Sequence, residues 1–559
     1  MSISNPNLPK LFLALRHYSV KLFLHDLLAG VTVGLVALPL AMAFGIASGV
    51  TPQAGLYTAV VAGFLISTLG GSRTQIGGPT GAFVVIVAGI VARFGMSGLA
   101  MVTAMAGVLL LIMGLTGLGA AVRFIPRMVV VGFTNGIAIL IASTQVKDFF
   151  GLRTGAVPSE FLPRMRLLAG HFSSLNFPAL GLGLGTLAIL LLLPRITRKV
   201  PASIVAVLVC TGVSFAFHLS VETIGSKFGG IPRGLPPFAF PDFHSEHFLP
   251  LIPSAFTVAL LAALESMLSA VVADGMTGDR HNSNVELVAQ GVANIVSPLF
   301  GGIPATGAIA RTATNIRAGA RSPVSGIIHS LTLLLILLIA APLASYIPLA
   351  TLAAVLFVVA YNMGEWQEIG GILRLDATAI SVWLVTFALT VFADLTVAVG
   401  VGLTLAALLY IYRVADTTTV SPVTDDYIRD GLPHTLQGRI LPPFVTLLRI
   451  HGPFLWGTTE KLVEATLDLD AFQPVVILRL RNMSAIDATG IHAIETFARR
   501  LHDSGRTMLL CGAMEQPSKL LSGSRFLDHI GRANVMPNIQ AALDRAQEIH
   551  TVQSGAAVS

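Results

Sequence analysis

Charged residues are scarce in this sequence, and their scarcity excludes most soluble folds. Of 559 residues, 11% are charged and 54% are hydrophobic, and the mean hydropathy is +0.78. Many apolar runs reach about 18 residues or more, which is the length that a transmembrane helix requires. These runs do not alternate apolar and polar residues, so they exclude a transmembrane β-barrel. The composition therefore predicts an α-helical polytopic membrane protein.

Cysteine and the common catalytic motifs are also missing or rare. Only Cys210 and Cys511 are present, which excludes a disulfide framework and a cysteine zinc site. The sequence has no Gly-x-Ser-x-Gly motif, Walker loop or metal-ligand spacing, so we expect no enzyme, no cofactor, no metal site and no ATP-driven transport. No basic stretch is interleaved with aromatic residues, so the net charge of +6 does not predict nucleic-acid binding.

Apolar segments are what the chain has in abundance. We expect about 14 spans, two of them short: residues 26–48, 55–70, a short helix at 77–85, then 97–119, 128–146, 177–194, 202–219, 252–274, 285–300, 306–317, 323–342, 346–362, 377–394 and 396–413.

The basic residues of the short loops predict the orientation of these spans in the membrane. With a cytoplasmic N-terminus and no cleavable signal peptide, one side of the membrane holds Arg73, Arg123, Arg127, Arg195, Arg198, Lys199, Arg280, Arg317 and Arg321. The short loops on the opposite side carry almost no charge. Cytoplasmic loops are typically enriched in Lys and Arg, so this bias predicts a cytoplasmic N-terminus and a multi-pass protein of a bacterial inner membrane.

The stretch from Ala262 to Ser322 is the most informative part of the chain. A carboxylate, Glu265, lies within an apolar run, and a Gly- and Pro-rich break precedes a short helix that begins near Thr306. Ionisable groups inside a membrane cost about 2.5–3.5 kcal/mol each on insertion scales, so they indicate function. Broken helices at mid-membrane are the best sequence indicator of a transporter binding site.

An internal repeat supports this interpretation. Leu69-Gly70-Gly71 followed by Thr80-Gly81-Ala82 resembles Phe300-Gly301-Gly302 followed by Thr306-Gly307-Ala308. With seven spans in each half, the halves would have opposite topology, and the binding site of such inverted repeats lies at the midplane between them. The alternative is that Gly-rich helix junctions recur by chance in apolar proteins.

Changes in composition along the chain predict its domain organisation. We expect an N-terminal cytoplasmic segment (1–25), a transmembrane domain (26–414) with inverted repeats at about 26–220 and 251–414, a polar linker (415–442), an α/β domain (443–550) and a tail (551–559). Strand-like runs alternate with helical patterns in the α/β domain, which predicts a mostly parallel sheet.

Several motifs together resemble the sulfate permease (SulP) family, the solute carrier 26 anion transporters. They are Asp26-x-x-Ala29-Gly30, Gly78-Pro79-Thr80-Gly81, Gly132-Phe133-Thr134-x-Gly136, Asn284-x-Glu286-Leu287-x-x-Gln290-Gly291-x-x-Asn294 and Arg311-Thr312-Ala313-x-Asn315. The C-terminal domain resembles the STAS domain that follows the transporter in this family. The resemblance covers nearly the full chain and implies a 7+7 inverted repeat with a UraA-like core and gate, in which spans 1–4 and 8–11 form the core.

The resemblance also implies a function. Residues 265–317 look most like the C4-dicarboxylate transporters of the family, which implies proton-coupled uptake of dicarboxylates such as succinate. The alternatives are a sulfate or bicarbonate symporter, an anion exchanger or channel-like conductor, and a non-transporting scaffold. A homodimer, and a STAS domain that binds a cytoplasmic regulatory protein, are implied in the same way.

The two half-helices are the expected anion site. Their free N–H groups and helix dipoles would point at a common position, where they attract an anion. We expect substrate contacts from Thr80, Gly81, Ala82, Thr306, Gly307, Ala308 and Arg311. Arg311, expected four to five residues inside its half-helix, would reach back to the anion. In the alternative, it snorkels from a short helix to the cytoplasmic surface.

Glu265 is the expected coupling residue. A carboxylate removed from water takes up a proton more readily, which would couple a proton to an incoming anion. The resemblance also places the family's coupling carboxylate, for a proton or sodium ion, at this position. Ser269 lies one turn further along the same helix. A structural ion pair between Glu265 and Arg311 is the alternative, and Asn135, Asp394 and His329 are expected to be structural.

The STAS domain contributes one candidate site. Asp487, Thr489 and Gly490 form a loop that resembles the Asp-Ser/Thr-Gly loop of STAS proteins. By analogy with soluble STAS proteins, the loop would be phosphorylated or respond to nucleotides. We favour the simpler interpretation that Asp487 or Thr489 caps the following helix.

Overall fold

The computed structural model describes most of the chain as two compact units, residues 1–404 and residues 405–559. The described residues are 8–16, 18–119, 126–155, 157–158, 160–197, 200–231, 234, 236, 238–240, 248–393, 395–423, 441–523 and 530–556. Arg123, Arg198, Lys199 and Asp394, which were singled out from the sequence, lie outside the described residues.

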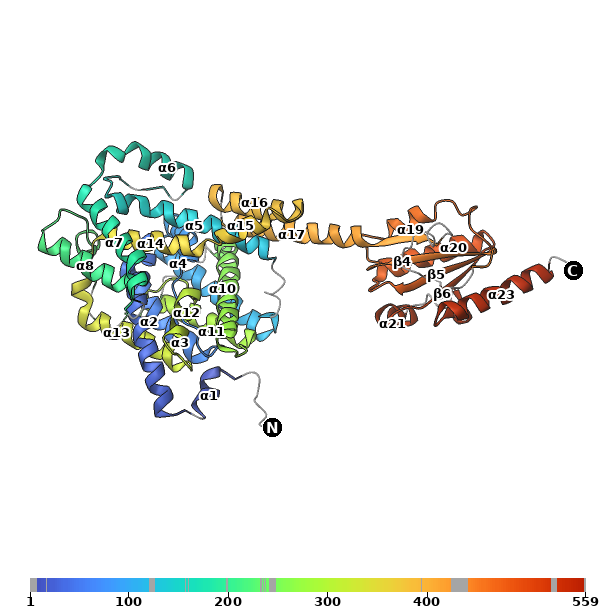
Figure 1. The fold of residues 1–559 in the computed structure, drawn as a ribbon, viewed down its shortest axis with the longest axis horizontal. Helices are drawn as coiled ribbons and strands as arrows, with labels where there is room; N and C mark the ends of the chain where they lie inside the picture. The colour runs from blue at the N-terminus through green and yellow to red at the C-terminus, as the bar shows by residue number, and fades with distance from the viewer. Residues whose placement is uncertain are drawn as a thin grey trace. The chain divides into compact units, whose positions relative to one another are not determined.

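The first unit is helical (Figure 1). Its helices are α1 (Lys10–Leu15), α2 (Val20–Ala47), α3 (Pro52–Leu69), α4 (Val84–Leu115), α5 (Arg127–Phe150), α6 (Phe161–Gly170), α7 (Phe177–Ile196), α8 (Ala202–Ala216), α9 (Ile224–Phe228), α10 (Phe248–Thr277), α11 (Ser283–Val296), α12 (Ile309–Arg317), α13 (Val324–Ala344), α14 (Leu349–Met363), α15 (Trp366–Ile372), α16 (Ala377–Phe392) and the first part of α17 (Leu395–Thr417), which continues into the second unit. Nine helical segments in the described part of the chain are long and apolar enough to cross a membrane.

Every span expected from the sequence corresponds to a helix or half-helix. Helix α4 contains two of them, because Gly95 interrupts it with non-helical angles (φ 66°, ψ −169°). The short expected helix is therefore the part before Gly95, preceded by the 3-10 turn η1 (Gly81–Phe83). Its counterpart in the second half is α12, which has nine residues. These are the two broken helices that the inverted repeat predicts.

The helices of the first unit pack as two groups. The core group consists of α2, α3, α4, α10, α11, α12 and α13, in which α11 and α10 pack on α4, and α13 packs on α2 and α3. The gate group consists of α5, α7, α8, α14 and α16, in which α16 and α14 pack on α5, and α7 packs on α14 and α8. Figure 1 shows α12 beside α10, within the core group. The helices of the observed core group are the expected spans 1–4 and 8–11, which the family resemblance assigned to the core.

A two-stranded bridge joins the halves of the core group. Strand β1 (Gly77–Gly78) pairs antiparallel with β2 (Thr306–Gly307), with Gly77 opposite Gly307 and Gly78 opposite Thr306. Each strand directly precedes a half-helix. The bridge therefore brings the first turns of the two half-helices together, although they lie far apart in the sequence.

The second unit contains a five-stranded sheet, in the order β3-β4-β5-β6-β7. Its strands are β3 (Thr419–Pro422), β4 (Val445–His451), β5 (Val475–Asn482), β6 (Thr507–Cys511) and β7 (Val535–Met536), all parallel except β3. Helices α19 (Glu460–Ala465), α20 (Ala488–Asp503) and α21 (Glu515–Gly523) cover one face. Helix α23 (Ile539–Ala556) covers the other face. Successive apolar side chains of β4 and β5 point to opposite faces of the sheet, so both faces need a covering of helices.

Two expected boundaries of this unit differ from the structure. Residues 415–422 are not a polar linker, because α17 continues to Thr417 and β3 pairs with β4. Residues 424–440 of that linker lie outside the described residues. The expected tail from residue 551 continues α23 as far as Ala556.

Candidate anion site

The candidate site begins where the half-helices start. Thr80 is the N-cap of η1, and Ala308 is the N-cap of α12; both have extended backbones. Neither side chain caps its own helix in the structure, so backbone N–H groups at both N-termini are available to a ligand. Gly81, Ala82, Thr306 and Gly307 are buried in the same region. The structure thus brings together the backbone segments that the sequence singled out.

Glycine is required at the centre of the bridge. Gly78 has φ +146°, and a Cβ there would lie 2.6 Å from Nη1 of Arg311. A Cβ on Gly307 would lie 1.7 Å from Nε2 of Gln75. Larger residues at either position would displace the polar side chains that surround the site.

Arg311 lies in the first turn of α12, not four to five residues inside it, because α12 begins at Ile309. Its side chain is only 3% exposed, so it does not snorkel to the surface. Nη2 donates a hydrogen bond to the Pro79 carbonyl, next to the first half-helix. Nη1 has no hydrogen-bond partner among the described residues. A buried, charged N–H donor of this kind is suited to an anion.

Glu265 is connected to the first half-helix by one hydrogen bond. Thr80 Oγ1 donates to Glu265 Oε2 over 2.7 Å. No ion pair joins Glu265 to Arg311 in the described structure, although their opposite charges attract each other over a longer distance. The structural Glu–Arg pair considered above is therefore not formed here as a direct contact.

The Glu265 side chain also faces the gate group. It lines a small cavity of about 30 Å³, together with Val129 and Phe133 of α5 and Val399 of α17. A cavity of that volume holds about one water molecule. The carboxylate thus lies at the boundary between the core and gate groups, where relative motion of the groups would change its surroundings.

Ser269 is fully buried and makes a different contact from the one expected. Its hydroxyl lies 3.0 Å from Oγ1 of Thr312, on α12. It has no hydrogen bond to Glu265 in the described structure. Ser269 therefore connects α10 to the second half-helix, and its predicted role in ion coupling remains a prediction.

Sequence reasoning missed a buried polar network beneath the site. Gln75 Nε2 donates to Ser266 Oγ (3.0 Å), and Ser266 Oγ donates to Glu286 Oε1 (3.4 Å). Glu286 also accepts hydrogen bonds from the backbone of Gly71 (2.9 Å) and Ser72 (3.2 Å). A signal was present, because polar residues at 286, 290 and 294 fall on one face of a helix.

We predict that Glu286→Ala destabilises the protein more than Glu286→Gln. Alanine leaves the Gly71 and Ser72 N–H groups buried without an acceptor, and each such group costs about 1–3 kcal/mol. Glutamine keeps one acceptor oxygen. Thermal unfolding in detergent should show a lower midpoint for the alanine variant. The control is Glu368→Ala, which removes a half-exposed carboxylate and its weak surface ion pair with Arg127. Equal midpoints for Glu286→Ala and the unmodified protein would contradict this role.

The loop at 487–490 is a helix cap in the structure. Asp487 is the N-cap of α20; its Oδ1 accepts from Gly490 N (2.8 Å) and its Oδ2 from Trp456 N (3.0 Å). Thr489 is exposed in the first turn of the helix.

In the neighbouring strand β6, burial raises the pKa of the Cys511 thiol to about 11, so the thiol stays protonated at neutral pH.

We predict that Asp487→Ala loosens the start of α20. Loss of an N-cap costs about 1 kcal/mol, which corresponds to roughly fivefold more frequent local opening. Hydrogen exchange of the full-length protein should show faster exchange at the amides of Gly490 and Trp456. Exposed Asp503, at the other end of the helix, is the control position. Unchanged exchange at both amides would show that Asp487 does not stabilise the loop.

Comparison with known proteins identifies two family models in the chain. The model described as "Sulfate permease family" matches residues 23–386, and the model described as "STAS domain" matches residues 439–542. The curated relatives include the "Putative sulfate transporter YvdB" of Bacillus subtilis (strain 168), 42% identical over 92% of this chain and 96% of that protein. The "Bicarbonate transporter BicA" of Picosynechococcus sp. is 31% identical over 93% of this chain and 94% of that protein.

Solved structures show the same fold. The overall structure of SLC26A9 matches with a TM-score of 0.86 over 98% of this chain and 94% of that chain, at 18% identity. The transmembrane domain of a cyanobacterial BicA matches with a TM-score of 0.61 and 32% identity, over 70% of this chain and 98% of that chain. With two half-helices meeting at a buried arginine and a STAS domain following, the chain belongs to the sulfate permease family and is a membrane anion transporter, not an enzyme.

Proposed function

We propose that the protein is a secondary active transporter of a small inorganic oxyanion, sulfate or bicarbonate, coupled to protons or sodium ions through Glu265. The relatives reported above are described as sulfate or bicarbonate transporters. They give no support to the C4-dicarboxylate substrate implied by the resemblance in the sequence, and they favour its alternative. The observation that carries the proposal is the Thr80–Glu265 hydrogen bond, which connects the anion site to a titratable group.

The charges of the site support coupling to a cation. With Glu265 ionised and Arg311 charged, the pair is neutral overall, and a bound anion leaves the buried site with net negative charge. Burying uncompensated charge is costly, so uptake of a cation at Glu265 would offset it. One cation neutralises the single negative charge that bound bicarbonate adds to the site, and two cations neutralise the double charge of sulfate. Protonation of Glu265 also weakens its attraction for the Thr80 hydroxyl, which would then be free to contact the anion.

The two helix groups support transport by relative motion. All the proposed anion-binding residues belong to the core group, whereas Val129 and Phe133, which border Glu265, belong to the gate group. Movement of one group past the other would expose the site alternately to the two sides, as in other inverted-repeat transporters. We further propose a bacterial plasma-membrane location, a cytoplasmic N-terminus and STAS domain, and a homodimer.

Uptake into liposomes tests the proposal. Purified protein would be reconstituted, and uptake of labelled sulfate, bicarbonate and succinate measured with and without inward proton and sodium gradients. We expect gradient-stimulated uptake of sulfate or bicarbonate and weak uptake of succinate. Succinate uptake exceeding both would overturn the substrate. An anion current or an anion exchange that neither cation gradient changes would favour the exchanger or channel-like alternative. No uptake of any of the three anions would favour the non-transporting scaffold.

A further inference from the structure

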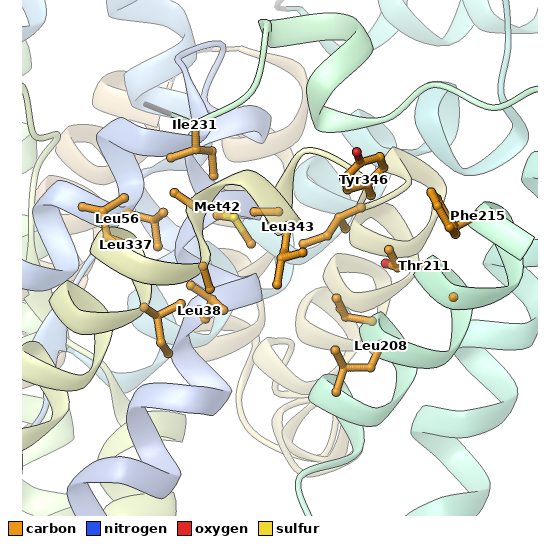
Figure 2. A pocket seen from close by; sticks show the side chains of 17 residues that line it. Leu38, Met42, Leu56, Leu208, Thr211, Phe215, Ile231, Leu337, Leu343 and Tyr346 are labelled. Atoms are coloured by element: carbon orange, nitrogen blue, oxygen red, sulfur yellow. The ribbon is translucent and has the colours of Figure 1, made fainter. Parts of the chain in front are cut away.

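A large apolar cavity lies between the core and gate groups, away from the anion site. Its volume is about 490 Å³, within the ~300–1,000 Å³ range of ligand pockets in proteins. Helices α2, α3 and α13 of the core group form one wall, and α8 of the gate group forms the other. In Figure 2, Leu38, Met42, Leu56 and Leu337 lie across the cavity from Leu208.

The cavity belongs to one leaflet of the membrane. Its lining residues come from the second half of α2, the beginning of α3, the second half of α8 and the end of α13. Since α3 begins where α2 ends, these helix ends lie on the side of the membrane opposite the start of α2. With the proposed orientation, the cavity opens in the outer leaflet.

The mouth of the cavity is continuous with the lipid-facing surface. Its floor is buried, with Met42 at 0% and Leu337 at 1% exposure, whereas the side chains at its rim are exposed, including Phe215 (62%) and Leu343 (69%). In a membrane protein, such exposed apolar side chains face acyl chains. Water is absent at this depth, so hydrocarbon is the medium that reaches the cavity.

Thr211 adds a polar feature to this apolar wall. Thr186, Thr257 and Thr386 each donate to the carbonyl four residues earlier in their helices, which satisfies the hydroxyl within the membrane. The Thr211 hydroxyl is buried without a hydrogen-bond partner in the described structure. Figure 2 shows Thr211 on the cavity wall, with Tyr346 at the rim.

We propose that this cavity is a phospholipid site, in which one acyl chain fills the space between α2, α8 and α13 and an ester carbonyl accepts a hydrogen bond from Thr211. The apolar walls suit the chain, and Tyr346 has the amphipathic character of residues at the headgroup level. Because the cavity has one wall in each helix group, the bound lipid contacts both. The bound lipid therefore stabilises the arrangement of the core and gate groups in which the cavity is open.

Two substitutions test the site without disturbing the packing. A Cβ on Gly212 meets nothing within 4 Å, so Gly212→Leu projects into the cavity with little steric cost. Thr211→Val removes the donor and preserves the shape. Gly181→Leu on α7 is the matched control, because Gly181 is also exposed and its Cβ also meets nothing within 4 Å.

The first measurement is the phospholipid that stays with the protein during purification in mild detergent, determined by mass spectrometry. We expect at least one tightly held phospholipid in the unmodified protein. Gly212→Leu should remove it, Thr211→Val should reduce its retention about fivefold through the lost hydrogen bond, and Thr211→Ser and Gly181→Leu should retain it. Equal retention in Gly212→Leu and Gly181→Leu, or no retained lipid in the unmodified protein, would overturn the proposal.

The second measurement locates the lipid. Protein in vesicles containing phosphatidylglycerol with a photoreactive diazirine on one acyl chain would be irradiated and digested. Labelling should be concentrated in peptides 207–215 and 336–347 and should disappear in Gly212→Leu. Uniform labelling of the lipid-facing helices, unaffected by the substitution, or a changed oligomeric state without a change in lipid, would refute the site. Neither readout requires transport, so failure here is separable from failure of the proposed function.

Discussion

Arg311→Gln should lower anion uptake by at least roughly 30-fold, the effect of losing about 2 kcal/mol or more from a buried charged contact. The substitution removes the cation of the site, whose Nη1 has no hydrogen-bond partner within the described part of the chain, and the donor that contacts the Pro79 carbonyl. Initial rates of labelled sulfate and bicarbonate uptake into liposomes measure the effect.

Arg317→Gln is the matched control for this prediction. Arg317 lies on the same helix but is exposed in its last turn, so its loss should leave uptake within about twofold. Both variants should elute as the unmodified protein does on size exclusion. Arg311→Lys should recover part of the activity, since lysine keeps the charge but not the two-nitrogen fork. Normal uptake by Arg311→Gln would remove Arg311 from the anion site.

Glu265→Gln should abolish gradient-driven accumulation. If one proton moves with each anion, a gradient of one pH unit contributes about 1.4 kcal/mol, which corresponds to roughly tenfold accumulation. Glutamine can still accept the Thr80 hydrogen bond but cannot take up a proton. The accumulation ratio should therefore fall to the value measured without a gradient, while exchange of internal for external anion continues.

Two further variants distinguish coupling from folding. Glu265→Asp retains a carboxylate and should retain gradient dependence, at a lower rate because the shorter side chain is farther from Thr80. Glu368→Gln changes a half-exposed carboxylate, whose surface ion pair with Arg127 is worth little, and should have no effect on accumulation. Accumulation by Glu265→Gln that equals that of the unmodified protein would place the coupling ion elsewhere in the molecule.

Side chains that are anomalous for their surroundings could be located from the sequence. Glu265 is a carboxylate in an apolar run, and the cost of burying its charge indicates a function. The two Gly- and Thr-rich breaks interrupt long helices, and the cost of leaving backbone groups free inside a membrane indicates a binding site there. The two helix groups were accessible only through the family resemblance, because each combines segments from both halves of the chain.

The contacts of these residues could not be predicted in the same way. The partner of Arg311 is the backbone carbonyl of Pro79, and a carbonyl has no sequence signature. The Gln75–Ser266–Glu286 network connects three separate elements, each unremarkable alone. Strand β3 was misjudged as linker because four residues are too few to show a period. The sequence does not select the anion, because sulfate, bicarbonate and succinate all suit the same donors, so the predicted dicarboxylate substrate stays a prediction.

The pairing of β1 with β2 has a consequence for biosynthesis. The partners Gly77 and Gly307 are separated by about 230 residues, so β1 enters the membrane long before β2 exists. At roughly 5–20 residues per second, the interval is on the order of 10–50 seconds. During that time the first half-helix has neither the bridge nor Arg311 to satisfy its polar groups. The nascent first half of the protein is therefore the stage at which a membrane chaperone would be needed, and truncated chains ending before Thr306 should be degraded.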